Sequence, residues 1–280
     1  IMPSLVGSEM CIRDSNHRVL SQAWSSSERR WTLTVEVGGE RTVIIRCRFI
    51  IGCTGYYDFD KAHEPHFPGR DAFEAAGGLV LHPQFWPRDV NLAHKRVVVV
   101  GSGATAISMV PALAKTCTHV VMVQRSPSYV IALPRYFSPV LSLVFDALAW
   151  VKFGLGVRLA QALLRWGQKW LDWFLYTFCI ACPSFARRIF WWLAAPRLGD
   201  KAEQLRPHLT PSYDPWRQRV SADADGEFFK ALRDGKASIV TSALSAFTCS
   251  GVRLANGTEV DCDVVAVSYT HLRAHETRHD

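Results

Sequence analysis

The stretch that decides the fold of this chain is Arg96-Val97-Val98-Val99-Val100-Gly101-Ser102-Gly103-Ala104-Thr105-Ala106. It begins with an apolar run typical of a buried strand and ends in the pattern GxGxxA, which leads from a strand into a helix. Apolar residues then recur at helical spacing, and a second apolar run, His119 to Val123, has the composition of another strand. Strand, helix and strand together have the length of one β-α-β unit. The sequence therefore predicts an α/β fold built on a Rossmann-like dinucleotide-binding domain.

The glycines of this loop have separate physical functions. Gly101 permits the tight turn after the strand, and Gly103 lets a pyrophosphate approach the backbone. The helix that follows offers free N–H groups and a partial positive charge to that phosphate. We therefore predict that a dinucleotide is bound by Gly101, Ser102, Gly103, Ala104, Thr105 and Ala106.

The end of the second predicted strand bears on which nucleotide is bound. An NAD-specific site usually has Asp or Glu there to hold the ribose 2′-hydroxyl, whereas this chain has Gln124-Arg125-Ser126. A guanidinium beside a hydroxyl suits a 2′-phosphate, because it binds two phosphate oxygens at once. The sequence predicts NADPH, held by Arg125 and Ser126; a solvated surface arginine is the alternative.

A second β-type region precedes this unit. The runs Trp31 to Val37 and Thr42 to Ile51, joined by Gly38-Gly39, predict a β-hairpin. The second run becomes wholly apolar at Phe49-Ile50-Ile51, as expected of a central strand in a buried sheet. It ends in Gly52-Cys53-Thr54-Gly55, where such a strand would meet a ligand. We therefore predict that Thr54 and Gly55 bind a cofactor.

Between Tyr56 and Asp89, prolines and glycines are too dense for long helices, which predicts an ordered linker. The linker contains His82-Pro83-Gln84-Phe85-Trp86-Pro87. A histidine and a tryptophan four residues apart in a proline-bounded turn have no evident role in a core. We interpret His82 as a hydrogen-bonding ring that a flexing linker keeps in place; a purely structural turn is the alternative.

Composition limits the class of protein. With 280 residues, 49% of them hydrophobic and 20% charged, the chain fits a globular protein with a large core rather than a disordered, collagen-like or disulfide-stapled one. The formal net charge is +7, but the basic residues are scattered, which favours an anionic small ligand over a nucleic acid. The 8 cysteines lack a framework spacing, which predicts reduced thiols and a cytoplasmic location.

The region from Pro134 to about Pro196 is rich in tryptophan and has apolar residues near a helical stripe. Charged residues interrupt it too often for a membrane span, which needs roughly 18 to 20 apolar residues. We expect a buried helical subdomain here. A surface that touches a membrane is the alternative. Between Gly226 and Val267 the sequence again has patterns typical of β-strands.

Both ends look foreign to the rest of the chain. Residues 1–15 have no clear period, and residues 268–280 interrupt the apolar run Val264 to Val267. Both resemble translated sequencing-adapter text, so we predict that neither is native. His271, His275 and His279 would share one helical face and suggest a metal site, but the adapter interpretation is favoured and no metal is predicted.

The order of these motifs resembles that of the flavin-containing Baeyer–Villiger monooxygenases, particularly those similar to the ethionamide-activating enzyme. The resemblance rests on Gly78-x-x-x-His82-x-x-x-Trp86-Pro87, the loop at Gly101 and Gln124-Arg125-Ser126-Pro127, and it covers roughly residues 16–267. Cys53-Thr54-Gly55-Tyr56-Tyr57 looks like the segment that leaves the family's FAD domain. One departure concerns the phenylalanine expected two residues before Gly78, where Ala76 stands and Phe73 lies three residues earlier.

The resemblance implies a monooxygenase that uses FAD, NADPH and O₂ to insert one oxygen atom into a ketone or to oxidise a sulfur centre. It implies catalytic roles for His82 and Trp86. Pro215-Trp216-Arg217-Gln218-Arg219 resembles the region of the family's active-site arginine, and Arg219 is the matching position. A cation there would stabilise negative charge that develops during oxygen transfer; an arginine that merely pairs with a carboxylate is the alternative.

The resemblance also implies a domain order. Residues 16–60 would end an FAD-binding domain, 61–94 would form the linker, 95–135 and 220–267 the NADPH-binding domain, and 136–219 a helical insertion. No FAD fingerprint stands in the chain, so we expect an internal fragment that is inactive alone. The alternatives are a flavin monooxygenase that oxidises nitrogen or sulfur, and a nucleotide-binding or membrane-associated module without catalysis. The oligomeric state is not predicted.

Overall fold

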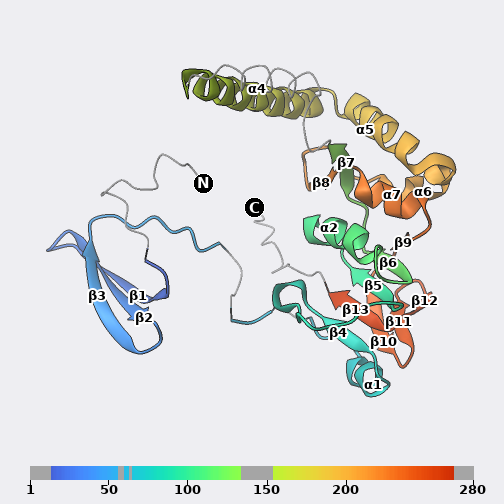
Figure 1. The fold of residues 1–280 in the computed structure, drawn as a ribbon, viewed down its shortest axis with the longest axis horizontal. Coiled ribbons are helices and arrows are strands. Elements are labelled where there is room, and N and C mark those ends of the chain that lie inside the picture. The colour runs from blue at the N-terminus through green and yellow to red at the C-terminus, as the bar shows by residue number, and fades with distance from the viewer. Residues whose placement is uncertain (1–13, 56–59, 63–64, 134–153, 268–280) are drawn as a thin grey trace, which may run out of the picture. The chain divides into compact units, whose positions relative to one another are not determined.

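The computed structural model describes residues 14–55, 60–62, 65–133 and 154–267, and the chain divides into two compact units between Tyr57 and Asp58 (Figure 1). Each unit is described by itself. The predictions for residues 1–13 and 268–280, including the three terminal histidines, lie outside the described residues.

The first unit is a three-stranded antiparallel sheet in the order β1-β2-β3, formed by β1 (His17–Ser25), β2 (Arg30–Val37) and β3 (Arg41–Cys47). The predicted hairpin is confirmed: Val37 pairs with Arg41 across a turn in which Gly38 and Gly39 have φ values of 64° and 77°. Only glycine adopts such values without strain, so the turn fits the sequence. Val35 is the buried residue of this sheet.

The prediction that Phe49-Ile50-Ile51 forms a buried central strand is wrong for this structure. β3 ends at Cys47, and the side chains of Phe49 and Ile51 are each 86% exposed. An apolar run becomes a buried strand only when neighbouring strands supply its backbone partners. No strand among the described residues pairs with residues 49–51.

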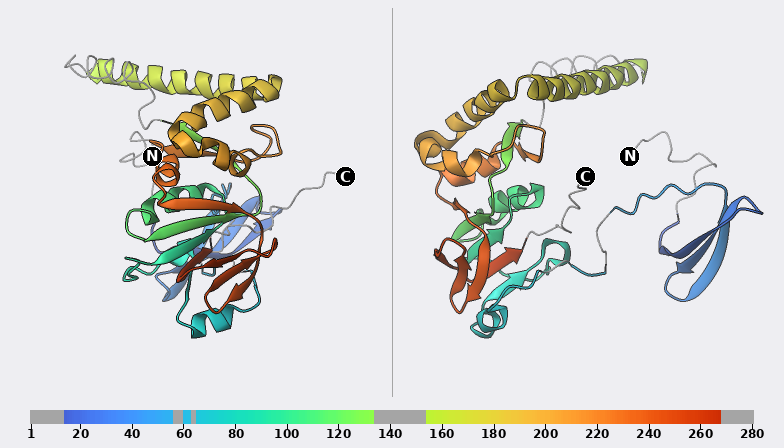
Figure 2. Two further views of the ribbon diagram at one scale, coloured as in Figure 1. Left: turned by 90° about the vertical axis from the view of Figure 1, so that its right-hand side faces the viewer. Right: turned by 180° about the vertical axis from the view of Figure 1, so that it is seen from behind.

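The second unit is built on a five-stranded parallel sheet in the order β4-β13-β5-β6-β9 (Figures 1 and 2). Its strands are β4 (Leu79–Leu81), β5 (Arg96–Val100), β6 (His119–Gln124), β9 (Ala237–Thr241) and β13 (Val264–Val267). The predicted β-α-β unit is confirmed as β5, α2 (Ala104–Leu113) and β6. β4 and the short helices α1 (Arg70–Ala75) and η2 (Pro83–Phe85) lie within the predicted linker, so that segment also contributes the edge strand of the sheet.

Successive side chains of β5 alternate between two cores, as the period of a strand requires. Val97 and Val99 face one core, which is covered by α2, by α7 (Glu227–Arg233) and by α6 (Ala202–Leu209). Val98 and Val100 face the other, which is covered by α1 and by an antiparallel sheet of β10 (Leu244–Thr248), β11 (Gly251–Leu254) and β12 (Glu259–Asp261). One face of the parallel sheet is therefore covered by helices and the other mainly by strands.

The chain between β6 and β9 leaves the parallel sheet and returns to it. β7 (Tyr129–Leu133) leads out and β8 (Val220–Ala224) leads back, and the two pair in parallel, Tyr129 opposite Val220. Between them lie α4 (Gly154–Ala181), α5 (Pro183–Leu198), the one-turn η3 (Gly199–Lys201) and α6, as Figures 1 and 2 show.

The region is helical from Gly154 onward, as predicted, but the prediction that it is buried is wrong for the exposed tryptophans of α4. Trp166, Trp170 and Trp173 are each about 60% exposed. Among the described side chains of α4, Cys179, with Leu175 and Phe178 beside it, joins a small cluster with Phe190 of α5. A helix is buried on all sides only when a second layer covers it. Within the described residues, no helix has the length and hydropathy that crossing a bilayer requires.

Candidate functional site

All five strands of the large sheet are parallel, so their carboxyl ends meet at one edge, which is where open α/β sheets bind ligands. His82 follows β4, Gly101 follows β5 and Arg125 follows β6. The structure therefore brings most of the predicted site residues of this unit to the same edge.

The loop after β5 has the shape that a pyrophosphate needs. Gly101 has a φ of 127°, a value that an L side chain rarely adopts, and its N–H donates to the carbonyl of Val123 at 2.8 Å. Gly103 is the N-cap of α2 and has extended backbone. Its carbonyl accepts from the N–H of Ile107, so the N–H groups of Ala104, Thr105 and Ala106 have no carbonyl to bond within the helix. These donors are available to an anion.

Ser102 is placed differently from the other loop residues. Its side chain is buried, and its Oγ lies 3.1 Å from the Oγ of Ser128 and donates to the carbonyl of Ser126 at 3.4 Å. The hydroxyl therefore holds the loop against the segment after β6 instead of facing outward. If Ser102 contacts a nucleotide as predicted, the contact is made by its backbone N–H and not by its hydroxyl.

Arg125 and Ser126 are exposed and directly follow β6, beside the loop. Their proximity to the loop follows from the hydrogen bond between Ser102 and the carbonyl of Ser126.

Arg219 lies beside the same loop, although it is more than a hundred positions away in the chain. Its Nη1 stands 3.9 Å from the point where a Cβ on Gly103 would be. Two contacts explain this approach. The hydroxyl of Ser102 lies within hydrogen-bond distance of the hydroxyl of Ser128. Tyr129, which follows Ser128, pairs with Val220, and Val220 directly follows Arg219. The carbonyl of Arg219 also accepts from the hydroxyl of Tyr213 at 2.9 Å. The edge thus carries two guanidinium groups, which suits a ligand with several phosphates.

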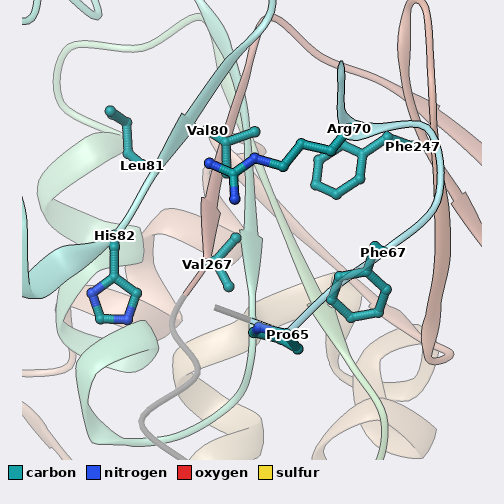
Figure 3. Close-up of a pocket in the computed structure, with 8 residues that line it drawn as sticks. All are labelled: Pro65, Phe67, Arg70, Val80, Leu81, His82, Phe247 and Val267. Atoms are coloured by element: carbon teal, nitrogen blue, oxygen red, sulfur yellow. The ribbon is translucent and has the colours of Figure 1, made fainter. Parts of the chain in front are cut away.

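His82 is the N-cap of η2 and is buried, with its Nδ1 accepting from the N–H of Gln84 at 3.2 Å. Figure 3 shows its ring at the end of β4, near Val267 and below Leu81 in that view. The cavity lined by these residues and Arg70 measures about 10 Å³, roughly the volume of one water molecule. Trp86 packs against the main core. The expectation that Trp86 has no role in a core is therefore wrong, and the burial of His82 and the core contact of Trp86 favour the structural alternative as much as the functional one.

The departure from the family motif before Gly78 has a structural counterpart. A Cβ on Gly78 would stand 2.4 Å from the ring of Phe73, and the N–H of Gly78 donates to the carbonyl of Phe73 at 2.9 Å. Phe73 belongs to α1, and its ring lies against Gly78. Thr54 and Gly55 lie in the first unit and are exposed.

Sequence reasoning missed a polar network behind the edge. Gln124, at the end of β6, is buried and donates from Nε2 to the carbonyl of His208 at 2.7 Å and to Oγ1 of Thr241 at 2.9 Å. Nδ1 of His208 lies 2.7 Å from the same Oγ1. Burial lowers the pKa of His208. The signal in the sequence was a glutamine at the end of an apolar strand, which needs partners once it is buried.

Comparison with known proteins agrees with this geometry. A family model described as flavin-binding monooxygenase-like matches residues 15–163, more than half of the chain. The chain belongs to this family. Flavin-binding monooxygenase-like proteins with curated descriptions include the FAD-containing monooxygenase EthA of Mycolicibacterium smegmatis, 37% identical over 252 residues. They also include the probable FAD-binding monooxygenase AlmA of Acinetobacter baylyi, 37% identical over 257 residues.

These alignments cover 90% and 91% of the chain but 49% of each relative. The chain thus spans about half the length of the curated relatives it matches. Among solved structures, OTEMO in complex with FAD and NADP matches 91% of the chain and 52% of its own length, with a TM-score of 0.60 and 18% identity. That likeness supports the fold of this flavin-binding monooxygenase-like chain.

Proposed function

We propose that this chain forms the NADPH-binding part of a monooxygenase that uses FAD and NADPH. The enzyme inserts one atom of O₂ into a ketone, giving an ester, or adds it to a sulfur centre. The second oxygen atom leaves as water, and NADPH supplies the two electrons. The observation that carries the proposal is the loop from Gly101 to Ala106, with its open N–H groups and two nearby guanidinium groups. The relatives are named as FAD-containing or FAD-binding monooxygenases, which supports FAD as the second cofactor.

Each group at the edge has a defined task in this proposal. The backbone from Gly101 to Ala106 holds the pyrophosphate, and the amino-terminal end of α2 lowers the energy of its charge. Arg125 and Ser126 hold the 2′-phosphate, which NADH lacks. Arg219 pairs with the negative charge of the pyrophosphate at the loop. In the complete enzyme it also stabilises negative charge that develops during oxygen transfer. We also propose that Thr54 and Gly55 contact the flavin.

His82 and Trp86 are proposed to act at the join between the sheet edge and the preceding linker. His82 is fixed by the Gln84 N–H, and Trp86 is fixed by the core, so the turn between them keeps one geometry. Bound FAD supplies the reaction with oxygen. The chain's own residues bind the nicotinamide nucleotide, orient it and exclude water.

Nucleotide titration tests the binding half of the proposal. Arg125→Ala should weaken NADPH binding about tenfold or more and leave NADH almost unchanged, because only NADPH has a phosphate at that position. Arg219→Ala should weaken both nucleotides, because it lies at the loop that holds their common pyrophosphate. Arg253→Ala removes an exposed arginine of β11 and serves as the control. Equal losses of NADPH and NADH affinity in Arg125→Ala would contradict the assignment.

Product analysis tests the chemistry. The full-length enzyme should convert a ketone to an ester, or a sulfide to a sulfoxide, with NADPH consumed in equal amount. Oxidation of amines with no ester formed would instead support the alternative class of flavin monooxygenase. A His82→Asn variant that keeps nucleotide affinity but loses the ester product would support a role for His82 beyond folding.

A second candidate function is contact with a lipid surface, and it rests on the exposed face of α4. Trp166, Trp170 and Trp173 share one face of the helix, opposite Leu175. Tryptophan is enriched at membrane interfaces, and the cationic residues Arg165 and Lys169 on the same helix would face anionic lipid headgroups. Free thiols at all seven described cysteines support a cytoplasmic location, so the lipid would be a cytoplasmic leaflet.

Vesicle sedimentation tests this second candidate. The full chain should pellet with vesicles rich in phosphatidylglycerol and remain in solution with pure phosphatidylcholine. Replacing Trp166, Trp170 and Trp173 with serine should abolish pelleting, whereas Trp24→Ser, in an exposed position of β1, should not. Equal pelleting of the triple variant would rule out this surface.

A further inference from the structure

A cavity of about 200 Å³ lies in the second unit, and no residue of the loop from Gly101 to Ala106 lines it. Its lining comes from β7, α5, α6 and α7. The floor is apolar and buried, and is formed by Tyr129, Val130, Phe190, Ala194, Leu209 and Phe229. A hydrocarbon body of several carbon atoms could replace water on this floor, which is favourable for each methylene buried.

The rim of the cavity is cationic. Arg187, Arg188 and Arg206 line it, and two carboxylates offset part of their charge. Arg187 pairs with Asp214 at 2.6 Å, and Arg206 lies 3.5 Å from Glu203 and over the ring of Trp191. Within the part of the chain that the structure describes, Arg188 has no ion pair. The rim therefore carries one uncompensated positive charge.

Arg187 and Arg188 are neighbouring residues of α5, and both line the cavity. The charge of Arg187 is offset by Asp214 at 2.6 Å, whereas no described carboxylate offsets that of Arg188. A carboxylate at the rim would provide the negative charge that Arg188 lacks.

We propose that this cavity binds a medium-chain carboxylate, with its head group at Arg187 and Arg188 and its acyl chain on the floor formed by Phe190, Leu209 and Phe229. Two guanidinium groups favour a planar, two-oxygen anion over a neutral alcohol. The apolar floor favours an acyl chain over a bare anion. None of the residues proposed to bind the nucleotide lines this cavity, so the proposal does not rest on the proposed oxygenase activity.

Isothermal titration calorimetry of the full 280-residue chain tests the proposal, with decanoate as the probe at concentrations below micelle formation. Decanol and inorganic phosphate are the comparison ligands, because each has only one of the two recognised parts. We expect decanoate to bind at least tenfold more tightly than either. Equal affinity for decanoate and decanol, or no binding of decanoate, overturns the proposal, and stronger binding of phosphate than of decanoate does so as well.

Variants locate the binding. Arg188→Gln removes the uncompensated charge without breaking an ion pair, and should weaken decanoate about tenfold, while decanol is unaffected. Arg253→Gln removes an exposed arginine from β11 together with its ion pair to Glu259, changes the net charge by the same amount, and should bind decanoate like the parent chain. A circular-dichroism melt of each variant verifies that folding is intact. Equal weakening in both variants would show that decanoate responds to net charge alone, and would overturn the assignment to this cavity.

Discussion

Asp223 is a single residue that decides how a helix begins. Its side chain is 3% exposed, and its two carboxylate oxygens accept from the backbone N–H of Phe228 at 3.1 Å and from that of Phe229 at 3.3 Å. These N–H groups belong to the first turn of α7, where no carbonyl of the helix can serve them. Burial is the main cause that raises the pKa of Asp223, and these hydrogen bonds oppose it.

Asp223→Ala should therefore lower the free energy of unfolding by about 1–3 kcal/mol, because two buried donors lose their acceptor. Asp223→Asn keeps one acceptor oxygen and should lose less. Urea unfolding measures both, with Asp234→Ala, an exposed carboxylate near the end of the same helix, as the control. A change of less than about 0.5 kcal/mol in Asp223→Ala would show that water replaces the cap.

At the scale of elements, the join between α1 and β4 depends on one close contact. The ring of Phe73 occupies the space where Gly78 would carry a side chain, at 2.4 Å from the position of a Cβ. Gly78→Ala should therefore force the ring to move and should cost about 1–3 kcal/mol, as overpacked cores do. The double variant Gly78→Ala with Phe73→Leu makes room for the added methyl group. In a double-mutant cycle, the double variant should lose less unfolding free energy than the two single variants lose together, by at least about 0.5 kcal/mol.

His208 joins α6 to the ends of β6 and β9 through Gln124 and Thr241. Because burial lowers its pKa, the folded chain binds fewer protons than the unfolded chain between the folded pKa and the usual value of about 6.5. The neutral ring thus contributes stability above about pH 6.5, and this contribution is lost as the pH falls through the folded pKa.

His208→Gln should flatten the dependence of unfolding free energy on pH below about 6.5, since glutamine does not titrate. His66→Gln changes an exposed histidine and should keep the dependence of the parent chain. The measurement is urea unfolding at several pH values between about 5 and 7.5. Parallel curves for the parent and His208→Gln would contradict the assigned burial effect.

At the scale of the whole molecule, the thiols report which parts are closed to solvent. Cys53, Cys182 and Cys249 are exposed, whereas Cys117, Cys179 and Cys262 are buried. Burial raises the pKa of Cys262 to about 12, and it also raises the pKa of Cys117 and of Cys179. A thiol with a raised pKa has little thiolate, which is the reactive form.

Brief alkylation with iodoacetamide at pH 8 should therefore label the three exposed cysteines and spare the three buried ones, as peptide mass spectrometry would show. Urea should make all six react at similar rates. Labelling of Cys262 without urea, at the rate of Cys249, would show that the connection between β12 and β13 opens easily.

Much of the second unit could be predicted because its signals are local. The run Arg96 to Val100, the glycines of the loop and the helical spacing after them lie within one β-α-β unit, so their geometry depends on near neighbours. Phe49-Ile50-Ile51 shows the limit of such reasoning. The same apolar pattern forms no strand here, because strand formation needs partners from elsewhere in the chain.

The sequence by itself determined the α/β class, the loop after β5 and the basic residue after β6, because steric preferences and periodicity act over a few residues. Only the tertiary structure decided that Arg219 stands beside Gly103, since this depends on Val220 pairing with Tyr129. It also decided that Arg187, Arg188 and Arg206 share one cavity, and that one face of α4 stays exposed. These arrangements come from contacts between residues far apart in the chain, and local sequence patterns do not predict such contacts.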